Sequence, residues 1–529
     1  MIEALAPTLA LPLLLLTGLP TGASAQSSPA AMDPSTAKRI EELADAGKSE
    51  EALKLCRKLM QLQPKEPFAA RQLLALLLKL GRIDDALDAG DRSLARFPKD
   101  VILLESLALA SQRKAEQFAK NPRSYRQASL YLQDAEGFAK RALKQQAKRR
   151  KSLAILGLAQ LQLGKGQAAL ETASKLTELF PKSASGPLLR AQIRLPLLTH
   201  GIREATLSEK ERFTLAGLIR KDCMLATRLE ASRYLPYRLL GDVAAWLGEI
   251  EEARTLYASA LARDPSRGAP HDWLLRQGAF AAHACYSQAI AKLSKRKDKH
   301  ARDEAILQWY RGIAAFHAED WQGTRESMAR CYALESSFVS SLYYNAVANY
   351  ESQRPQEALA LALALSQRGK KQFIGELRRA GADQTRQLKL FRVLALLAKN
   401  KGDLHGSREL NHCIASVADD ADSWNNHAFL CRETGRHEEA WTSYKRALAK
   451  APKDPQLLND AAVILQYHLK RDQGLARKMY QEAIRIAEQI LLEKKLSPAL
   501  LARAAQSRKD ARGNLKKLAP VKQDKKERP

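Results

Sequence analysis

Three stretches of the 529-residue sequence have residue types and spacing that could support chemistry. Gly164-Lys165-Gly166-Gln167-Ala168-Ala169 imitates a glycine-rich dinucleotide loop, in which backbone N–H groups cradle a pyrophosphate. His437-Glu438-Glu439 begins like a helical zinc motif, which needs two histidines on one helix face. Asp419-Asp420-Ala421-Asp422 offers carboxylates of the kind that bind a hard cation.

Each stretch lacks a part that its chemistry requires. The glycine loop follows a predicted helix, whereas a dinucleotide loop follows a strand. His437 has no second histidine at zinc spacing, and the aspartates lack calcium-loop spacing; we interpret them as a cap for a helix that starts near Ser423. The nucleophile motif G-x-S-x-G is absent from the sequence. The sequence therefore predicts no enzyme, no cofactor and no metal site.

The cysteines do not form a recognisable site either. None belongs to a C-x-x-C motif or matches a zinc-ligand spacing. Cys285 lies two residues after His283, and Cys413 directly follows His412; we interpret both pairs as chance neighbours on helices. Disulfide pairing stays open at this stage. The six cysteines are Cys56, Cys223, Cys285, Cys331, Cys413 and Cys431.

The composition favours helices as the elements that carry these residues. Ala and Leu are abundant, as in the run from Leu73 to Leu78, and β-branched runs bounded by turns are scarce. Charged residues make up 27% and hydrophobic residues 45%, which is typical of a globular protein. The chain is also longer than one compact core usually serves. These features predict an all-α fold that is not built around a single core.

Residues 421–454 contain a pattern of small and bulky side chains that indicates a packed helix pair. Trp424 precedes the small Ala428 by four residues, Gly435 marks a turn, and Ala440 and Tyr444 follow at helical spacing. The small residues would let two helices approach, and the bulky ones would fill the space between pairs. This stretch resembles the tetratricopeptide repeat, a unit of two antiparallel helices in about 34 residues.

Similar units recur along nearly all of residues 33–490, so the resemblance implies an α-solenoid, a right-handed superhelix of about 10–11 antiparallel helix pairs. Slips in the spacing predict insertions near 104–149, 184–233, 268–304 and 366–387. In and just after the second of these, Pro187, Pro196 and Pro236 predict interruptions. The clearest units are 33–66, 67–100, 150–183, 234–267, 305–338, 339–372, 388–421, 421–454 and 455–490.

The two ends of the sequence differ from the repeats. Residues 1–25 resemble a secretory signal peptide, with an apolar run from Leu9 to Leu16 and Ala23-Ser24-Ala25 before the expected cleavage site, although the positive charge typical of such leaders is missing. We therefore predict a protein exported to the periplasm or secreted, with cleavage after Ala25. Residues 26–32 read as a linker, and 491–529 as a capping helix followed by a basic disordered tail.

The net charge of +28 indicates an anionic partner or serves only for solubility. The basic clusters are Lys140-Arg141, 148–151, 292–299 and the tail, which we assign to loops and to the C-terminal end. Anionic lipid, a cell-envelope polymer or an acidic protein would each suit them. Nucleic acid fits an exported protein poorly, and no transmembrane span follows the leader.

The resemblance implies a protein-binding groove lined by the first helix of each pair. Aromatic residues beside cations would suit an extended peptide with apolar and acidic side chains. The alternative is that these aromatics pack between helices. An exported scaffold that binds a partner protein is thus the first hypothesis, and an anionic-surface binder is the second. The implied groove residues are Trp309, Phe316, Tyr343, Tyr350, Arg392, Lys399, Asn425 and Phe429.

Overall fold

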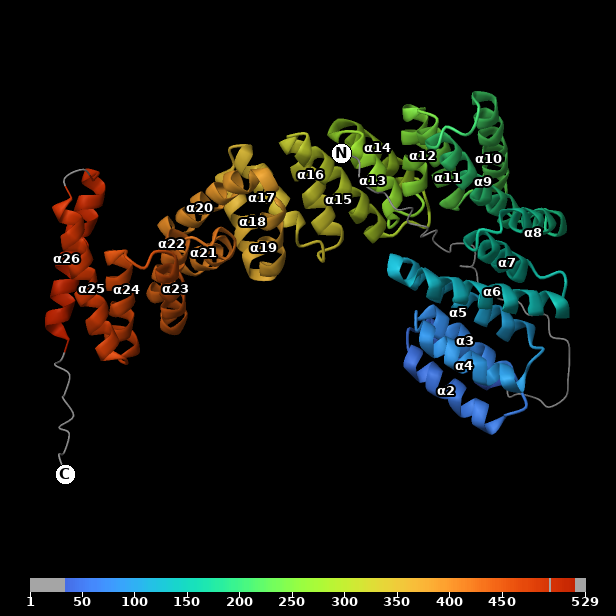
Figure 1. Cartoon of the computed structure of the whole chain (residues 1–529), viewed down its shortest axis with the longest axis horizontal. Helices are drawn as coiled ribbons and strands as arrows, with labels where there is room; N and C mark the ends of the chain where they lie inside the picture. Colours follow the sequence, from blue (N-terminus) through green and yellow to red (C-terminus); the bar gives the residue numbers. More distant parts are fainter. Residues whose placement is uncertain (1–33, 494–495, 519–529) are drawn as a thin grey trace. The chain divides into compact units, whose positions relative to one another are not determined.

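The computed structural model describes residues 34–493 and 496–518, and every regular element within them is a helix. The predicted all-α fold is therefore confirmed. The chain divides into two compact units, Met1–Asp264 and Pro265–Pro529 (Figure 1). The expected signal peptide, the linker and the last eleven residues of the tail lie outside the described residues, so export stays a prediction.

The first unit consists of helices that pack consecutively along the chain. Its most extensive contact joins α5 to α6, and its hydrophobic residues form successive clusters between neighbouring pairs. The helices are α1 (Pro34–Asp45), α2 (Ser49–Leu62), α3 (Phe68–Lys79), α4 (Ile83–Arg96), α5 (Val101–Ala119), α6 (Tyr125–Gln145), α7 (Arg150–Gln162), α8 (Gly166–Leu179), α9 (Ser185–Arg203), α10 (Glu209–Leu229), α11 (Leu235–Trp246) and α12 (Ile250–Leu261).

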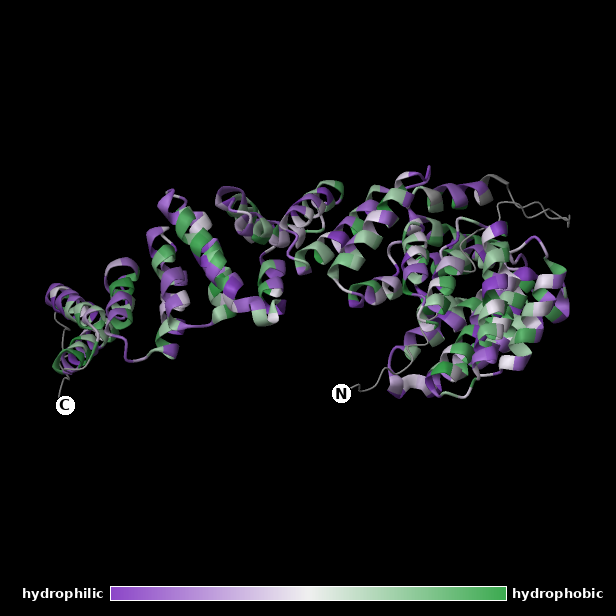
Figure 2. Ribbon diagram, turned by 90° about the horizontal axis from the view of Figure 1, so that it is seen from above, coloured by the Kyte–Doolittle hydropathy of each residue, from purple (hydrophilic) through white to green (hydrophobic). Residues whose placement is uncertain are grey.

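The second unit follows the same principle. Hydrophobic and hydrophilic residues alternate along its helices, as each helix buries one side against its neighbours (Figure 2). The helices are α13 (Gly268–Arg276), α14 (Ala279–Ser294), α15 (Ala301–His317), α16 (Trp321–Leu334), α17 (Ser341–Glu351), α18 (Pro355–Arg368), α19 (Lys370–Arg379), α20 (Gln384–Asn400), α21 (Leu404–Ala418), α22 (Ala421–Glu433), α23 (His437–Lys450), α24 (Pro455–Val463), α25 (Gln473–Leu492) and α26 (Pro498–Lys517).

A left-handed residue ends the first helix of most pairs. Gly435 has φ of 75°, and the N–H of Arg436 donates to the carbonyl of Cys431 at 2.7 Å, which closes the last turn of α22. Glycine adopts this conformation at little cost because it has no Cβ. Glu319 and Gln353 take the same role at φ of 56° and 61°, which explains why glycine spacing matches poorly there.

Small residues allow the helices of a pair to approach closely, as the sequence pattern predicts. A Cβ built on Gly241 in α11 would lie 2.8 Å from the ring of Tyr257 in α12, so only glycine fits at that contact. In the best-matching repeat, Ala428 and Ala440 are both fully buried. Trp424 and Tyr444 are buried beside them at 3% and 0% exposure.

Three of the four stretches in which the sequence predicts insertions contain long or short helices. The stretches 104–149 and 184–233 hold long pairs, α5 with α6 and α9 with α10, of which α6 and α10 have 21 residues each. The expectation of an interruption is wrong for Pro196, which lies inside α9, whereas Pro187 and Pro236 lie in the first turns of α9 and α11, where proline is compatible with a helix. The stretch 366–387 contains an added short helix, α19, between α18 and α20.

The C-terminal helix α26 packs against α25 and α24 at the end of the second unit. Lys516 and Lys517, which the sequence places in the basic tail, lie in its last turn. None of the helices in the described part of the chain combines the length and the apolar character that crossing a bilayer requires.

Candidate functional site

The predicted groove residues all lie on the first helices of successive pairs in the second unit. Trp309 and Phe316 lie on α15, Tyr343 and Tyr350 on α17, Arg392 and Lys399 on α20, and Asn425 and Phe429 on α22. Tyr350 and Asn425 are half-buried. The structure brings the other members into two groups, one aromatic and one cationic.

Trp309 and Phe316 meet around a residue that the sequence did not single out as part of the groove, Tyr344. The ring of Tyr344 lies edge-on to Trp309 at 5.5 Å and to Phe316 at 5.0 Å. Its hydroxyl donates to Glu376 of α19 at 2.9 Å. All three rings are half-buried, and each edge-on pair contributes about 0.5–1.5 kcal/mol. This aromatic group therefore packs between α15, α17 and α19 and keeps part of its surface accessible.

Tyr343 does not belong to an accessible surface. It is 1% exposed, and its ring stacks on Phe391 at 5.4 Å and lies 6.0 Å from Phe373. Its hydroxyl donates to Gln387. The added helix α19 supplies Phe373 and covers this side of α17. The alternative that the aromatics pack between helices therefore holds for Tyr343, which offers no surface to a partner.

Two cations flank the half-buried ring of Phe429. The Lys399 ammonium lies 4.5 Å from the ring centroid, and the Arg432 guanidinium lies 4.9 Å from it. Cation–π contacts at accessible positions contribute about 0.5–1 kcal/mol each. Lys399 is exposed, so its charge stays available while its contact with Phe429 fixes its position.

Arg392 lies two turns before Lys399 on the same face of α20. It donates to Asp420 at 2.9 Å and to Ser423 at 3.0 Å, and its side chain is 42% exposed. Asp420 also caps α22 by accepting the N–H of Ser423 at 2.7 Å, which confirms the cap interpretation of the aspartate cluster. We define the α20 face as Arg392, Val393, Leu396 and Lys399, all of them exposed, together with Phe429.

Two of the basic clusters that suggested an anionic partner form ion pairs with carboxylates of the same chain. Lys140 pairs with Glu136 at 2.7 Å, and Arg149 pairs with the buried Glu105 at 2.6 Å. Their assignment to loops is also partly wrong, because Lys140 lies within α6. These pairs reduce the positive charge that such clusters could offer to a polyanion.

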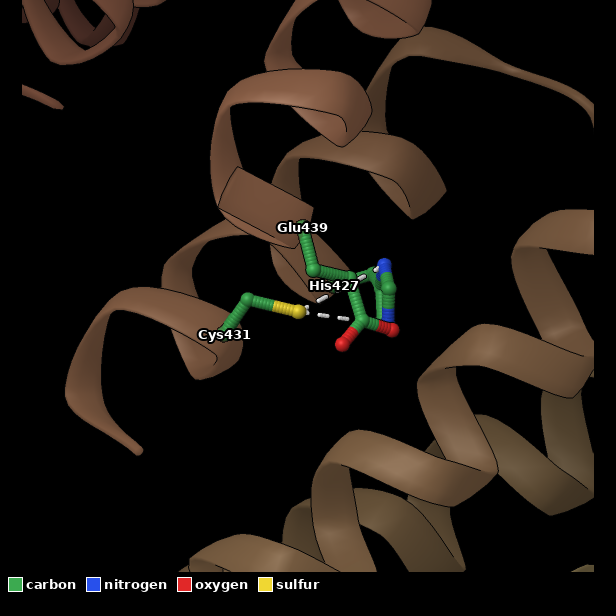
Figure 3. A group of neighbouring side chains, drawn as sticks. All are labelled: His427, Cys431 and Glu439. Carbon is green, nitrogen blue, oxygen red and sulfur yellow. Dashed lines mark hydrogen bonds and ion pairs between the residues drawn. The ribbon is translucent and has the colours of Figure 1, made fainter. Parts of the chain in front are cut away.

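A buried polar cluster that the sequence did not predict lies within the best-matching repeat. It consists of His427 and Cys431 on α22 and Glu439 on α23, whose side chains converge (Figure 3). The Nε2 atom of His427 lies 3.4 Å from the Cys431 sulfur and 3.6 Å from a Glu439 oxygen. The Nδ1 atom of His427 lies 2.9 Å from the Ser443 hydroxyl. We call this group the His427–Cys431–Glu439 cluster.

Burial controls the protonation of two members of this cluster. Desolvation, together with the neighbouring His412, lowers the pKa of His427 to about 3, so its imidazole is neutral near pH 7. Desolvation also raises the pKa of the Cys431 thiol to about 12. Cys431 faces His427 from the same helix, and the groups that face it from neighbouring elements are His412, Glu409, Arg408, Lys370 and Glu439.

The depressed pKa of His427 predicts a dependence of stability on pH. Between about pH 3 and pH 6.5 the histidine is protonated in the unfolded chain but neutral in the folded chain. The free energy of unfolding therefore rises with pH in this range. This group contributes at most about 1.4 kcal/mol per pH unit in that window. Hydrogen exchange of residues 421–450 at pH 5 and pH 7 measures it.

The His427→Leu variant should lose this contribution, whereas His405→Leu, which replaces an exposed histidine on α21, should keep it. A pH dependence that is identical in both variants would show that the folded state does not disfavour protonation of His427.

A spacing rule could have found part of this cluster. His427 and Cys431 are four residues apart, which places them on one face of a helix. Glu439 comes from the second helix of the pair, so only the helix pairing itself brings it in. A zinc motif built on His437 requires a second histidine on the same helix, so it does not include His427, Cys431 and Glu439.

Comparison with known proteins supports the repeat assignment for one segment directly. Residues 421–454 match the family model described as "Tetratricopeptide repeat". No curated protein matches the sequence.

Several solved structures match the chain at low identity. A TPR protein of Thermus thermophilus is 22% identical, with 39% of this chain and 98% of that chain covered and a TM-score of 0.28. A tetratricopeptide repeat protein from Parabacteroides merdae is 13% identical, with 59% and 97% covered and a TM-score of 0.34. YrrB, described as a TPR protein with an unusual peptide-binding site, is 12% identical, with 41% and 96% covered and a TM-score of 0.28.

Proposed function

We propose that this chain, a tetratricopeptide-repeat protein, is an exported scaffold that binds an extended, acidic segment of a partner protein on the α20 face. Repeats of this family generally serve protein–protein interaction. Export is part of the proposal and is supported by the signal-like residues 1–25. The observation that carries the binding site is the arrangement of Arg392, Lys399 and Phe429.

The chemistry of the α20 face suits such a segment. Arg392 and Lys399 are two turns apart and exposed. Lys399 can contact a carboxylate of an extended chain directly, and Arg392, which already donates to Asp420 and Ser423, can contact a second one through its remaining N–H groups. The exposed side chains of Val393 and Leu396 lie between them, at 46% and 55% exposure, and offer apolar contact. A partner segment in which acidic and apolar residues alternate would place carboxylates at the two cations and apolar side chains at Val393 and Leu396.

Capture of partners from the cell-envelope fraction tests the proposal. We expect the double charge reversal Arg392→Glu with Lys399→Glu to lower partner affinity at least tenfold, because two attractive contacts become repulsive. Phe429→Ala should lower the affinity as well, since it removes the ring that positions Lys399. Binding should be measured by titration of the captured partner against the full chain.

Lys58→Glu together with Lys54→Glu is the matched control, because it makes the same charge change on exposed lysines of α2 in the first unit. If both double reversals weaken binding equally, and modest salt abolishes it in the wild-type chain, the protein binds an anionic surface through its general charge instead, and the groove proposal fails.

A further inference from the structure

The His427–Cys431–Glu439 cluster presents three different metal-binding groups, an imidazole, a thiol and a carboxylate. One ligand atom from each lies within 4.8 Å of the others. We propose that this cluster binds one divalent transition-metal ion, with zinc as the best match. The proposed site lies inside a helix pair, is distinct from the α20 face, and does not depend on the proposed scaffold function.

Two of the three separations between the ligand atoms have the values expected in a tetrahedral site, and the third is below 4.8 Å. Zinc bonds of about 2.3 Å to sulfur and about 2.0–2.1 Å to nitrogen or oxygen place neighbouring ligand atoms about 3.3–3.6 Å apart at tetrahedral angles. The His427 Nε2 atom lies 3.4 Å from the Cys431 sulfur and 3.6 Å from a Glu439 oxygen. The Cys431 sulfur also lies 3.9 Å from His427 Nδ1 and thus faces the imidazole ring, so binding requires this ring to turn until the Nε2 lone pair points at the ion.

The donor set suits zinc in kind as well as in distance. Zinc accepts sulfur, nitrogen and oxygen ligands together, and the softer thiolate disfavours magnesium and calcium. Bound as a thiolate and a carboxylate, Cys431 and Glu439 balance the two charges of the ion. Burial that keeps His427 neutral leaves a ring nitrogen available for coordination. Binding must release the Cys431 proton, so the affinity should rise with pH.

Histidines that bind a metal usually form a hydrogen bond through their other ring nitrogen, and Ser443 is placed to accept one from His427. The Ser443 hydroxyl lies 2.9 Å from His427 Nδ1, and an Nδ1–H that donates to it leaves Nε2 unprotonated and able to bind the ion. The Glu439 side chain is 38% exposed, whereas His427 is 1% exposed and Cys431 is fully buried. Glu439 thus opens the site to solvent, and water can fill the fourth position.

Several other repeats of the same chain hold leucine where the cluster has its histidine. Aligned on the residue that ends the first helix, the place of His427 is taken by Leu73, Leu156, Leu240 and Leu394, and by the polar Arg311 and Asn345 in the units that end at Glu319 and Gln353. The place of Cys431 is taken by Leu77, Gln160, Ala244 and Ala398. A leucine packs there without a desolvation cost, whereas a buried imidazole needs partners. His427 and Cys431 therefore differ from the leucine-containing repeats, whereas another repeat holds the hydrogen-bonded pair Asn345 and Asn349 at the same two places.

Metal titration of the full-length chain, stripped with a chelator, tests the proposal. We expect one zinc ion per chain at this site, and cobalt in its place should give tetrahedral ligand-field bands and a thiolate charge-transfer band. His427→Leu, Cys431→Ala and Glu439→Gln should each weaken zinc binding more than tenfold. Ser443→Ala should weaken it by about 10–100-fold, as is typical for a group that supports a ligand.

Two variants serve as matched controls. Cys413→Ala removes a buried free thiol from α21, and Glu438→Gln changes the exposed glutamate next to Glu439. Both should keep the zinc affinity and the cobalt spectrum. Circular dichroism identifies any variant that fails to fold, and Glu439→Gln alters a half-exposed residue, so it remains informative if a core variant unfolds.

Two results would overturn the proposal. One is a stripped chain that binds no zinc at micromolar concentration. The other is zinc binding that persists in Cys431→Ala and Glu439→Gln, or a cobalt spectrum without a thiolate band, which would identify an adventitious ion only.

Discussion

Replacing Phe391 with alanine is expected to lower the local free energy of unfolding of the second unit by about 3–5 kcal/mol. The Phe391 ring is fully buried on α20 and lies 4.7 Å from Phe373 and 5.4 Å from Tyr343. Alanine would remove the apolar area of the ring and leave a cavity bounded by α17, α19 and α20. These three helices meet at the predicted insertion, so the added helix α19 should loosen first.

Hydrogen exchange of the full chain is the appropriate measurement, because a repeat array unfolds in parts and a single transition need not describe it. Protection should fall across residues 341–400. Val393→Ala, two residues along the same helix and 46% exposed, should change stability by no more than about 0.5 kcal/mol. Equal losses from the two variants would contradict the assignment of Phe391 to the core.

Replacing Asp222 with asparagine should destabilise the first unit by about 3 kcal/mol. Asp222 of α10 is 5% exposed and accepts from Arg190 at 2.6 Å and from Arg194, both on α9. Asparagine carries no charge, so Arg190 and Arg194 would lose the carboxylate that pairs with them. The NH2 group of asparagine would also take the place of one oxygen acceptor and face a guanidinium group, which is itself a donor. We place the effect at the low end for a buried ion pair because the arginines are 22% and 21% exposed.

Denaturant unfolding followed by hydrogen exchange of residues 185–229 measures this loss. Glu251→Gln is the matched control: it also removes a carboxylate paired with an arginine, Arg254, but its side chain is 84% exposed. That variant should cost at most about 1 kcal/mol. If Asp222→Asn proved as mild as Glu251→Gln, the link between α9 and α10 would not depend on this charge.

The helix pairs could be predicted because their determinants are local. Small residues such as Ala428 and Gly241 and the turn residue Gly435 recur at a fixed spacing, and each has a direct packing reason. The turns at Glu319 and Gln353 could not be found in this way, since neither residue type indicates a left-handed conformation. Proline also misled the prediction at Pro196, where tertiary packing keeps α9 continuous.

The candidate site was less predictable because contacts from distant segments decide which face of a helix is accessible. Tyr343 and Tyr344 are adjacent in α17, so their side chains point about 100° apart. The insertion could be located near 366–387, but only the structure shows that it places Phe373 of α19 against Tyr343. The cluster of His427, Cys431 and Glu439 likewise depends on the pairing of α22 with α23.

The most direct test of the proposed function is site-specific photo-crosslinking from Leu396, which is 55% exposed between Arg392 and Lys399 on α20. A photoreactive residue there should yield an adduct with a protein of the cell envelope, and the Arg392→Glu with Lys399→Glu reversal should suppress it. A photoreactive residue at Leu62, 68% exposed in the first unit, should not yield that adduct. No adduct at position 396, or a yield there that the charge reversal leaves unchanged, would contradict binding on the α20 face.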